Sequence, residues 1–214
     1  MKYKACIFDF DLTLADSSKG ILKCFKHTLE QFGYPIPDDK TIFSTIGYTL
    51  EDAFDMLTGI ENNPDKKQMR EAYVRFADDH MVQDTVFFDD SVAILQVLQQ
   101  AGVKVGIVST KMTYRILDSF SAHTSSMPVD EIIGGGEVKS HKPDPEGLNL
   151  MVEKLRVKKS DVLYVGDSHI DAETARNAGV DFAGVTTGTA TKEDFEKYPN
   201  VCIGSSLTEI FTSI

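Results

Sequence analysis

The sequence is poor in cysteine and contains no long apolar stretch. Its three cysteines, Cys6, Cys24 and Cys202, have no paired spacing, which excludes a disulfide framework and a cysteine-based zinc site. No run approaches the about 20 apolar residues that a membrane-spanning helix needs. The first residues lead directly into an apolar strand pattern and show no secretory signal. We therefore expect a cytoplasmic protein without a membrane partner.

Positive charge is also scarce. Lysine and arginine number 22 against 33 aspartate and glutamate residues, which gives a formal net charge of −11. Such a surface disfavours non-specific binding to nucleic acid or to an anionic membrane. It remains compatible with a small phosphorylated metabolite, because a few lysines can reverse the field inside one cleft. The five histidines show no ligand spacing, so none of them is expected to bind a metal ion.

The second part of the chain alternates short apolar runs with helical patterns and contains no internal repeat. We expect strands over 103–108, 131–133, 162–165 and 182–185, with an edge strand at 201–203. Helices are expected over 112–120, 170–177 and 207–211, and a further helix should start with Asp144 as N-cap and Pro145 in its first position. This alternation predicts an α/β fold with a Rossmann-like parallel sheet covered by helices on both faces.

The segment 17–85 breaks this alternation. Ile21, Phe25, Leu29 and Phe32 recur at helical spacing, and similar patterns follow them, without a convincing strand. We expect an all-helical cap domain over 17–85, inserted into a core domain made of 1–16 and 86–214. Inserted after the first strand, the cap would lie over the carboxyl ends of the strands, where open α/β sheets bind ligands. Asp16 and Ser17 are expected to form the hinge and the N-cap of the first cap helix.

Polar residues follow four of the expected apolar strands. Because the carboxyl ends of parallel strands meet at one edge of a sheet, these residues should lie close together. After the strands come, in chain order, Asp9 and Asp11, then Ser109 and Thr110, then Lys142, and finally Asp167 with Asp171 one helical turn later. The sequence therefore predicts a site with several carboxylates, a hydroxyl and an ammonium group.

This combination of groups suits phosphoryl transfer. Magnesium prefers hard oxygen ligands, which Asp9, Asp167 and the backbone carbonyl of Asp11 can supply. Asp9 is expected to attack phosphorus and form an aspartyl phosphate, while Asp11 protonates the leaving oxygen and then activates water. Lys142 can neutralise phosphate charge and restrain Asp9. Ser109 can donate a hydrogen bond to a phosphate oxygen.

The same motifs resemble those of the haloacid dehalogenase superfamily. The matching residues are Asp9-Phe10-Asp11-Leu12-Thr13, Ser109, Lys142 and the block 166–171, Gly-Asp-Ser-His-Ile-Asp. The closest similarity is to its phosphoglycolate phosphatase and pyrophosphatase group. The resemblance implies an Mg²⁺-dependent phosphatase that hydrolyses a small, phosphoglycolate-like phosphomonoester. It implies Asp9, Asp11, Asp167 and Asp171 at the metal, and Thr13, Ser109, Thr110 and Lys142 as substrate-binding residues.

Two positions depart from the pattern of the superfamily. Relatives usually have glycine where this chain has Leu12, and glycine tolerates backbone angles that leucine does not. Leu12 is therefore expected to narrow the pocket or to restrict the adjoining hinge. Thr110 stands where asparagine is common, and we expect that position to offer its backbone N–H, which the change leaves in place.

Several functions other than phosphomonoester hydrolysis remain open at this stage. A pyrophosphatase would use the same catalytic groups. A β-phosphoglucomutase-like mutase is disfavoured because no histidine occurs in Asp16-Ser17-Ser18-Lys19-Gly20. A receiver-like module, phosphorylated on aspartate without turnover, is disfavoured by the Asp-x-Asp pair and by the long insertion. The leaving group of the substrate is not decided, and neither is the oligomeric state.

Overall fold

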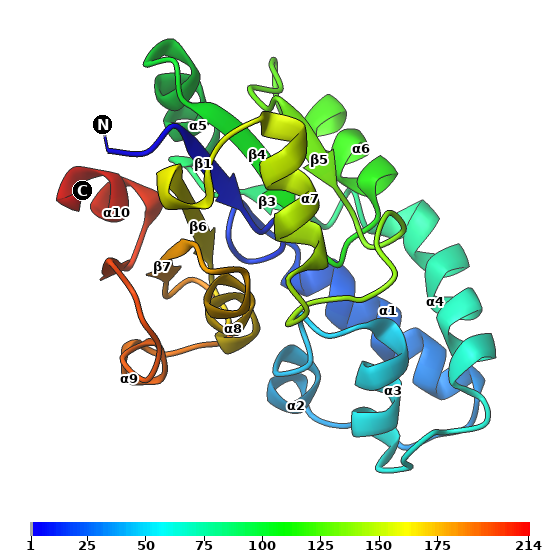
Figure 1. The fold of residues 1–214 in the computed structure, drawn as a ribbon. Coiled ribbons are helices and arrows are strands. Elements are labelled where there is room, and N and C mark those ends of the chain that lie inside the picture. The colour runs from blue at the N-terminus through cyan, green and yellow to red at the C-terminus, as the bar shows by residue number, and fades with distance from the viewer. Residues whose placement is uncertain (1) are drawn as a thin grey trace.

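Six parallel strands form the central sheet of the structure, a computed structural model that describes residues 2–214. In spatial order they are β5 (Glu131–Ile133), β4 (Lys104–Val108), β1 (Ala5–Phe8), β6 (Val162–Gly166), β7 (Asp181–Val185) and β8 (Cys202–Gly204). Every pairing in this sheet is parallel, and Ile7 on β1 lies between Gly106 on β4 and Tyr164 on β6. The predicted α/β fold with a parallel sheet is confirmed (Figure 1).

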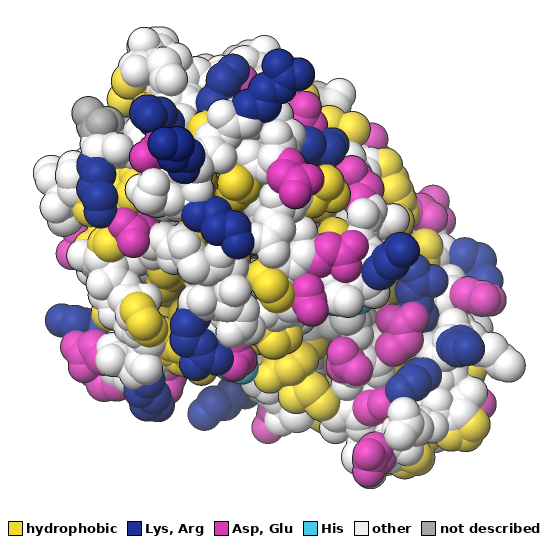
Figure 2. Space-filling model, in the orientation of Figure 1, with side chains coloured by type: hydrophobic (Ala, Val, Ile, Leu, Met, Phe, Trp, Pro, Cys, Tyr) yellow, Lys and Arg dark blue, Asp and Glu magenta, His cyan; other side chains and the backbone are white. Residues whose placement is uncertain are grey.

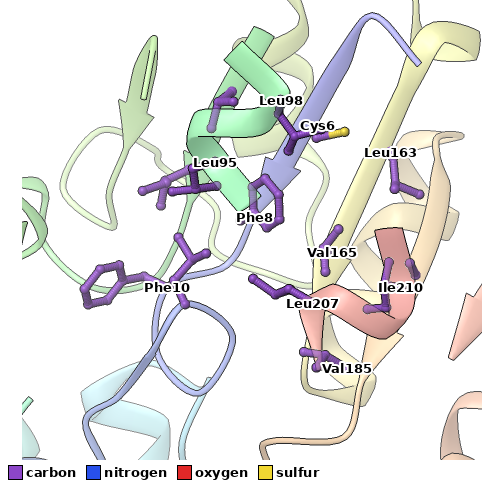
Figure 3. Close-up of a cluster of buried hydrophobic side chains, with 14 of the residues drawn as sticks. Cys6, Phe8, Phe10, Leu95, Leu98, Leu163, Val165, Val185, Leu207 and Ile210 are labelled. Atoms are coloured by element: carbon purple, nitrogen blue, oxygen red, sulfur yellow. The ribbon is translucent and has the colours of Figure 1, made fainter. Parts of the chain in front are cut away.

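Helices cover both faces of this sheet because successive side chains of a strand point to opposite sides. Cys6 and Phe8 pack with α5 (Ser91–Gln100), α6 (Thr113–His123) and α10 (Leu207–Ser213), in the cluster of Figure 3. Ala5 and Ile7 pack on the other face with α7 (Glu146–Leu155), α8 (His169–Ala178) and the short α9 (Lys192–Phe195). A short 3₁₀ helix (Lys159–Asp161) precedes β6. β1 is thus buried on both faces and fixes the position of the residues that follow it.

The ends of the core elements differ from the expectation by a few residues. α6 continues to His123 rather than ending at 120, and α8 ends at Ala178, one residue later than expected, with a left-handed Gly179 as its C-cap. Pro145, not Asp144, occupies the N-cap of α7. The Asp144 carboxylate still accepts a hydrogen bond from the backbone N–H of Glu146 at 2.9 Å, so it stabilises the helix start from one position further out.

Four helices make up the segment between β1 and the rest of the sheet. They are α1 (Ser18–Gln31), α2 (Asp39–Phe43), α3 (Leu50–Thr58) and α4 (Lys66–His80). They share a hydrophobic cluster of their own, in which Phe25 packs against Phe54 and Tyr73. A two-stranded antiparallel ribbon of β2 (Ala15–Asp16) and β3 (Val86–Phe87) lies at its two junctions with the core. We propose that 17–85 form a separate cap domain (Figure 1).

Ser17 occupies the N-cap position of α1, but its side chain does not cap the helix. The Asp16 carboxylate accepts the hydrogen bond from the backbone N–H of Ser18 at 2.9 Å. The Ser17 hydroxyl donates instead to the carboxylate of Asp11. The first residue of the cap is therefore joined directly to a residue of the predicted site.

Charged side chains of both signs are spread over the face shown in Figure 2. Lysine and arginine lie among aspartate and glutamate on both the core and the cap in that view. Within residues 2–214, no helix combines the length and the apolar composition that a membrane crossing requires.

Leu12 joins the first loop of the core to the cap. Its φ is +60°, a left-handed conformation that costs a non-glycine residue about 1 kcal/mol. Only 1% of the residue is exposed, because the side chain belongs to the hydrophobic cluster of the cap. Its N–H donates to the carbonyl of Ala15 at 2.7 Å, and its carbonyl accepts from the hydroxyl of Thr187 at 2.5 Å. Burial of the side chain therefore offsets the strain in the backbone.

This balance predicts how two substitutions at Leu12 rank. L12A keeps the strained φ and removes the buried side chain, so it should lower the free energy of unfolding by about 3 kcal/mol. L12G removes the same contacts but accepts the positive φ, and should be about 1 kcal/mol more stable than L12A. Urea unfolding of the three proteins tests this order. If L12A is the more stable variant, the left-handed conformation is wrong.

Candidate active site

The polar residues that follow the strands meet at the carboxyl edge of the sheet. Asp9 comes directly after β1, Ser109 after β4 and Asp167 after β6, and these three strands are neighbours in the sheet. Lys142 comes from the loop between β5 and α7. All four residues are largely buried. The predicted convergence is therefore seen in space.

Lys142 lies at the centre of this group and bridges two carboxylates. Its Nζ lies 2.9 Å from Asp9 Oδ2 and 2.6 Å from Asp171 Oδ1, and 5% of the side chain is exposed. Burial by itself lowers the pKa of Lys142, but the charges of Asp171 and Asp9 outweigh it and keep the pKa above its ordinary value. The ammonium group therefore stays protonated between the two carboxylates.

Asp171 is occupied on both of its oxygens. Oδ1 accepts from Tyr164 Oη at 2.8 Å and from Lys142, while Oδ2 accepts from the N–H and the hydroxyl of Ser168 at 3.2 and 2.5 Å. The N–H of Asp171 in turn donates to Ser168 Oγ, and these reciprocal bonds between Ser168 and Asp171 form the capping box of α8. A Cβ at Gly166 would lie 2.4 Å from that of Asp171, so only glycine fits beneath it. Asp171 thus fixes Lys142 while it caps the helix.

Three carboxylates lie close enough to share one cation. One oxygen each of Asp9, Asp167 and Asp171 lies within 4.8 Å of the others, and all three residues are buried. Burial raises the pKa of Asp9 to about 6, against the opposing charge of Lys142, and burial and the charge of Asp171 raise that of Asp167 well above its ordinary value. One ammonium group cannot balance three carboxylates. A divalent cation with a preference for hard oxygen ligands fits this donor set.

Asp167 is oriented by two further groups. Its Oδ1 accepts from the Thr13 hydroxyl at 2.9 Å, and its Oδ2 accepts from the N–H of Thr189 at 3.3 Å. A Cβ on Gly188 would lie 1.8 Å from Asp167 Oδ2, so the loop after β7 can pass over this carboxylate only because residue 188 is glycine. The loop therefore closes one side of the carboxylate cluster.

Asp11 faces a different environment from Asp9. Its Oδ1 lies 2.7 Å from Lys111 Nζ and accepts from the hydroxyl of Ser17, whereas Oδ2 has no hydrogen-bond partner among residues 2–214. Lys111 itself is buried, and its N–H donates to Ser109 Oγ at 3.3 Å. One oxygen of Asp11 is thus held in place while the other stays available for proton transfer.

A cavity of about 210 Å³ separates the cap from this edge of the sheet. On the core side it is lined by Asp11, Thr110, Lys111 and Arg115, and on the cap side by the loop 46–49 and by apolar residues of α1 and α4. Tyr48 in that loop contacts His169 of α8, with 3.3 Å between Oη and Nε2. The size of the cavity suits a small ligand, which the cap and the core would enclose together.

Comparison of the sequence and fold with those of known proteins shows the family of this chain. The model of the family described as haloacid dehalogenase-like hydrolase matches residues 6–185. The chain belongs to this family. The hydrolase is 45% identical to a haloacid dehalogenase-like hydrolase from Bacteroides fragilis, whose crystal structure superposes with a TM-score of 0.94 over 97% of this chain and 99% of that one.

Other relatives are more distant. Pyrophosphatase PpaX from Listeria monocytogenes is 29% identical over 188 residues, which cover 86% of this chain and 83% of that protein. A crystal structure described as a phosphoglycolate phosphatase from Lactobacillus plantarum is 22% identical, with a TM-score of 0.87 over the full length of both chains. The second similarity shows a shared fold. Both similarities agree with the place of the chain in the haloacid dehalogenase-like hydrolase family.

The structure places the predicted site residues of the hydrolase in two groups. Asp9, Lys142, Asp167 and Asp171 form the buried ion-pair cluster described above. Asp11 and Thr110 lie on the cavity wall, and Ser109 is buried next to them. Thr13, predicted to bind substrate, has 1% of its surface exposed and donates its hydroxyl to Asp167. It therefore orients a carboxylate here instead of facing the cavity.

Three contributors were not predicted from the sequence of the hydrolase. Tyr164 lies in the middle of β6 and reaches Asp171 from there. Ser17 binds Asp11, and the loop 187–189 covers Asp167 and Leu12. The loop has a recognisable signal, because Thr-Thr-Gly-Thr follows apolar strand β7 in the same way as the other site residues follow theirs. The two side chains have no such signal. Ser17 is six residues from Asp11 and Tyr164 seven residues from Asp171, and each pair meets only because the chain folds back between its two residues.

The carboxylate cluster predicts that divalent cations stabilise the folded hydrolase. A ligand that binds only the folded state raises the melting temperature by mass action. Added Mg²⁺ should therefore raise the Tm of the wild type in a concentration-dependent way, and D167N should lose most of this shift. D118N removes an exposed carboxylate of α6 and should keep the shift. Equal shifts in all three proteins would place the cation elsewhere.

Proposed function

We propose that this protein is an Mg²⁺-dependent phosphatase that hydrolyses a small, phosphoglycolate-like phosphomonoester through an aspartyl phosphate on Asp9. The observation that carries the proposal is the pairing of two different aspartates on one short loop. Asp9 is buried and fixed by Lys142 at 2.9 Å, whereas Asp11 lines the cavity with one oxygen that accepts no hydrogen bond from residues 2–214. The first arrangement suits a nucleophile and the second suits a general acid and base.

The first step transfers the phosphoryl group to the enzyme. A carboxylate oxygen of Asp9 attacks phosphorus while the bond between phosphorus and the leaving oxygen breaks. Protonated Asp11 gives its proton to that oxygen, so the leaving group departs as an alcohol. Lys142 and the hydroxyl of Ser109 neutralise and orient the phosphate oxygens, and the N–H of Thr110 would donate to them.

The second step returns the enzyme to its starting state. The Asp11 carboxylate takes a proton from water, and the water oxygen attacks phosphorus. The bond between phosphorus and Asp9 then breaks, which releases inorganic phosphate and the free carboxylate. The hydrogen bonds that Asp11 Oδ1 accepts from Lys111 Nζ at 2.7 Å and from the hydroxyl of Ser17 keep Asp11 in position through both steps.

The acidic cluster provides the cation site of this proposal. Asp9, Asp167 and the backbone carbonyl of Asp11 would bind Mg²⁺. Asp171 would act through water, because its own oxygens already accept four hydrogen bonds. When bound, the ion supplies positive charge that offsets the repulsion between the substrate phosphate and Asp9. In the absence of an ion, Lys142 alone opposes three carboxylates.

Pyrophosphate is the second substrate that an observation favours. The PpaX relatives are named pyrophosphatases and align with 86% of this chain, and the same two aspartates can cleave a phosphoric anhydride. The cavity of about 210 Å³ accommodates a leaving group of that size. In both cases the partner is a small phosphorylated metabolite, and a cytoplasmic location stays a prediction.

The nucleophile is tested by D9N, which removes the attacking oxygen and preserves the size of the side chain. Phosphate release from phosphate esters and pyrophosphate should require Mg²⁺ in the wild type and fall below detection in D9N. Mass spectrometry of the variant after the assay controls for deamidation back to aspartate. A D9N protein that still turns over without deamidation would contradict the proposed mechanism.

The acid and base are tested by D11N, which keeps the hydrogen-bonding shape but cannot carry the proton. We expect kcat to fall by roughly 10²- to 10⁴-fold, the usual contribution of general acid–base catalysis. D89N, an exposed aspartate of the segment that returns from the cap, is the matched control and should retain wild-type kcat. Similar rates in D11N and D89N would exclude Asp11 from proton transfer.

A further inference from the structure

The cations on the cavity wall are paired in different ways. Lys111 lies 2.7 Å from Asp11, and Arg70 Nε lies 3.2 Å from Glu51 Oε1. In both pairs the cation and the carboxylate line the cavity together, so each pair contributes little net charge. Arg115 also lines the cavity, but its partner does not. The carboxylate that balances the charge of Arg115 therefore lies outside the cavity wall, unlike the partners of Lys111 and Arg70.

Arg115 extends from core helix α6 to cap helix α4. Its Nη2 donates to the carbonyl of Val74 and to Asp78 Oδ1, both at 2.8 Å. Only 8% of the Arg115 side chain is exposed, whereas 49% of the Asp78 side chain is exposed. The carboxylate thus sits at the outer surface, and the guanidinium group lies between it and the cavity.

Most donors of Arg115 remain unused. A guanidinium group has five N–H donors, and both of the observed hydrogen bonds use Nη2. Nε and Nη1 have no partner among residues 2–214. They are not sealed either, because the only fully buried and unpartnered side-chain nitrogen or oxygen in that part of the chain is Asn149 Oδ1. The side chain that carries these donors is buried and lines the cavity.

We infer that Arg115 binds a second anionic group, carried by the part of the substrate that leaves. The inference rests on the proposed phosphatase function and narrows its substrate class. A buried guanidinium with free donors is costly unless a ligand uses them. Its planar fork matches the two oxygens of a carboxylate or a phosphate. The substrate would then be a phosphorylated short hydroxy acid or a diphosphate, not the phosphate ester of a neutral alcohol.

The surroundings of Arg115 strengthen this selectivity. Apolar residues of the cap, Ile21, Phe25 and Val74, form part of the wall opposite the core. The polar side chains there include Arg70, but its charge is paired with Glu51 on the same wall. Arg115 is also bonded to the carbonyl of Val74 in α4. This hydrogen bond fixes the guanidinium group of Arg115 beside the cavity when the cap and the core are arranged as in this structure.

The experiment compares two esters that differ only in the second charge. 2-Phosphoglycolate carries a carboxylate where 2-hydroxyethyl phosphate carries a neutral CH₂OH group. We expect the wild type to show kcat/KM at least tenfold higher for 2-phosphoglycolate, the gain typical of a charge-assisted bidentate contact. Pyrophosphate forms a third arm that distinguishes a phosphate from a carboxylate as the second group.

R115Q should lose this preference, with the ratio of the two kcat/KM values falling at least tenfold. R75Q makes the same chemical change at an exposed arginine of α4 and should keep the ratio. If R115Q does not fold, R115K keeps the charge without the planar fork and should lower the ratio. The preference of the wild type can be measured without any variant.

Two results would overturn the inference. One is a wild-type enzyme whose kcat/KM for 2-phosphoglycolate and for pyrophosphate does not exceed that for 2-hydroxyethyl phosphate, and the other is a folded R115Q that keeps the wild-type preference. Either result leaves the proposed phosphatase function standing, provided that hydrolysis needs Mg²⁺ and Asp9. If neither ester nor pyrophosphate is hydrolysed in an Asp9-dependent way, the proposed function fails and the inference fails with it.

Discussion

The ion pairs of Lys142 with Asp9 and Asp171 are the constraint on which the rest of the site depends. Three carboxylates in one buried cluster repel each other, and Lys142 is the cation that makes two of them tolerable. The surrounding structure keeps this lysine in place: Tyr164 and the capping box of Ser168 fix Asp171, and Asp171 fixes Lys142. A divalent cation would balance the carboxylate charge that Lys142 leaves over, and it would also offset the repulsion between the carboxylates and a substrate phosphate.

The loop after β1 connects this cluster to both domains by directing successive side chains to different places. Phe10 and Leu14 pack in the core, which anchors the loop to the sheet. Leu12 packs in the cap, at the cost of a left-handed backbone. Asp9 lies between the core residues Phe8 and Phe10, and Asp11 lies between Phe10 and Leu12, so their separation into a buried and a cavity-facing carboxylate follows from the packing. Displacing the cap would therefore alter the position of Asp11 more than that of Asp9.

Much of this arrangement could be predicted from the sequence because its signals are local. Short apolar runs that end in polar residues identify β1, β4 and β6, and the parallel sheet then brings Asp9, Ser109 and Asp167 to one edge. What failed were details decided by tertiary contacts. Ser17 has the sequence of a helix cap, yet its side chain does not cap α1, and its hydroxyl donates to the carboxylate of Asp11. The contact of Tyr164 with Asp171 depends on how α8 packs back on β6, and the contacts of Arg115 join α6 to α4. No local sequence pattern indicates either of them.

The central claim is that the phosphoryl group passes through Asp9, and trapping it there is the most direct test. The enzyme would be mixed with Mg²⁺ and substrate, quenched in acid during turnover and treated with borohydride, which reduces an acyl phosphate to an alcohol. Peptide mass spectrometry should then find homoserine in place of aspartate at position 9, and nowhere else. A label on another residue, or turnover without any label, would contradict the account.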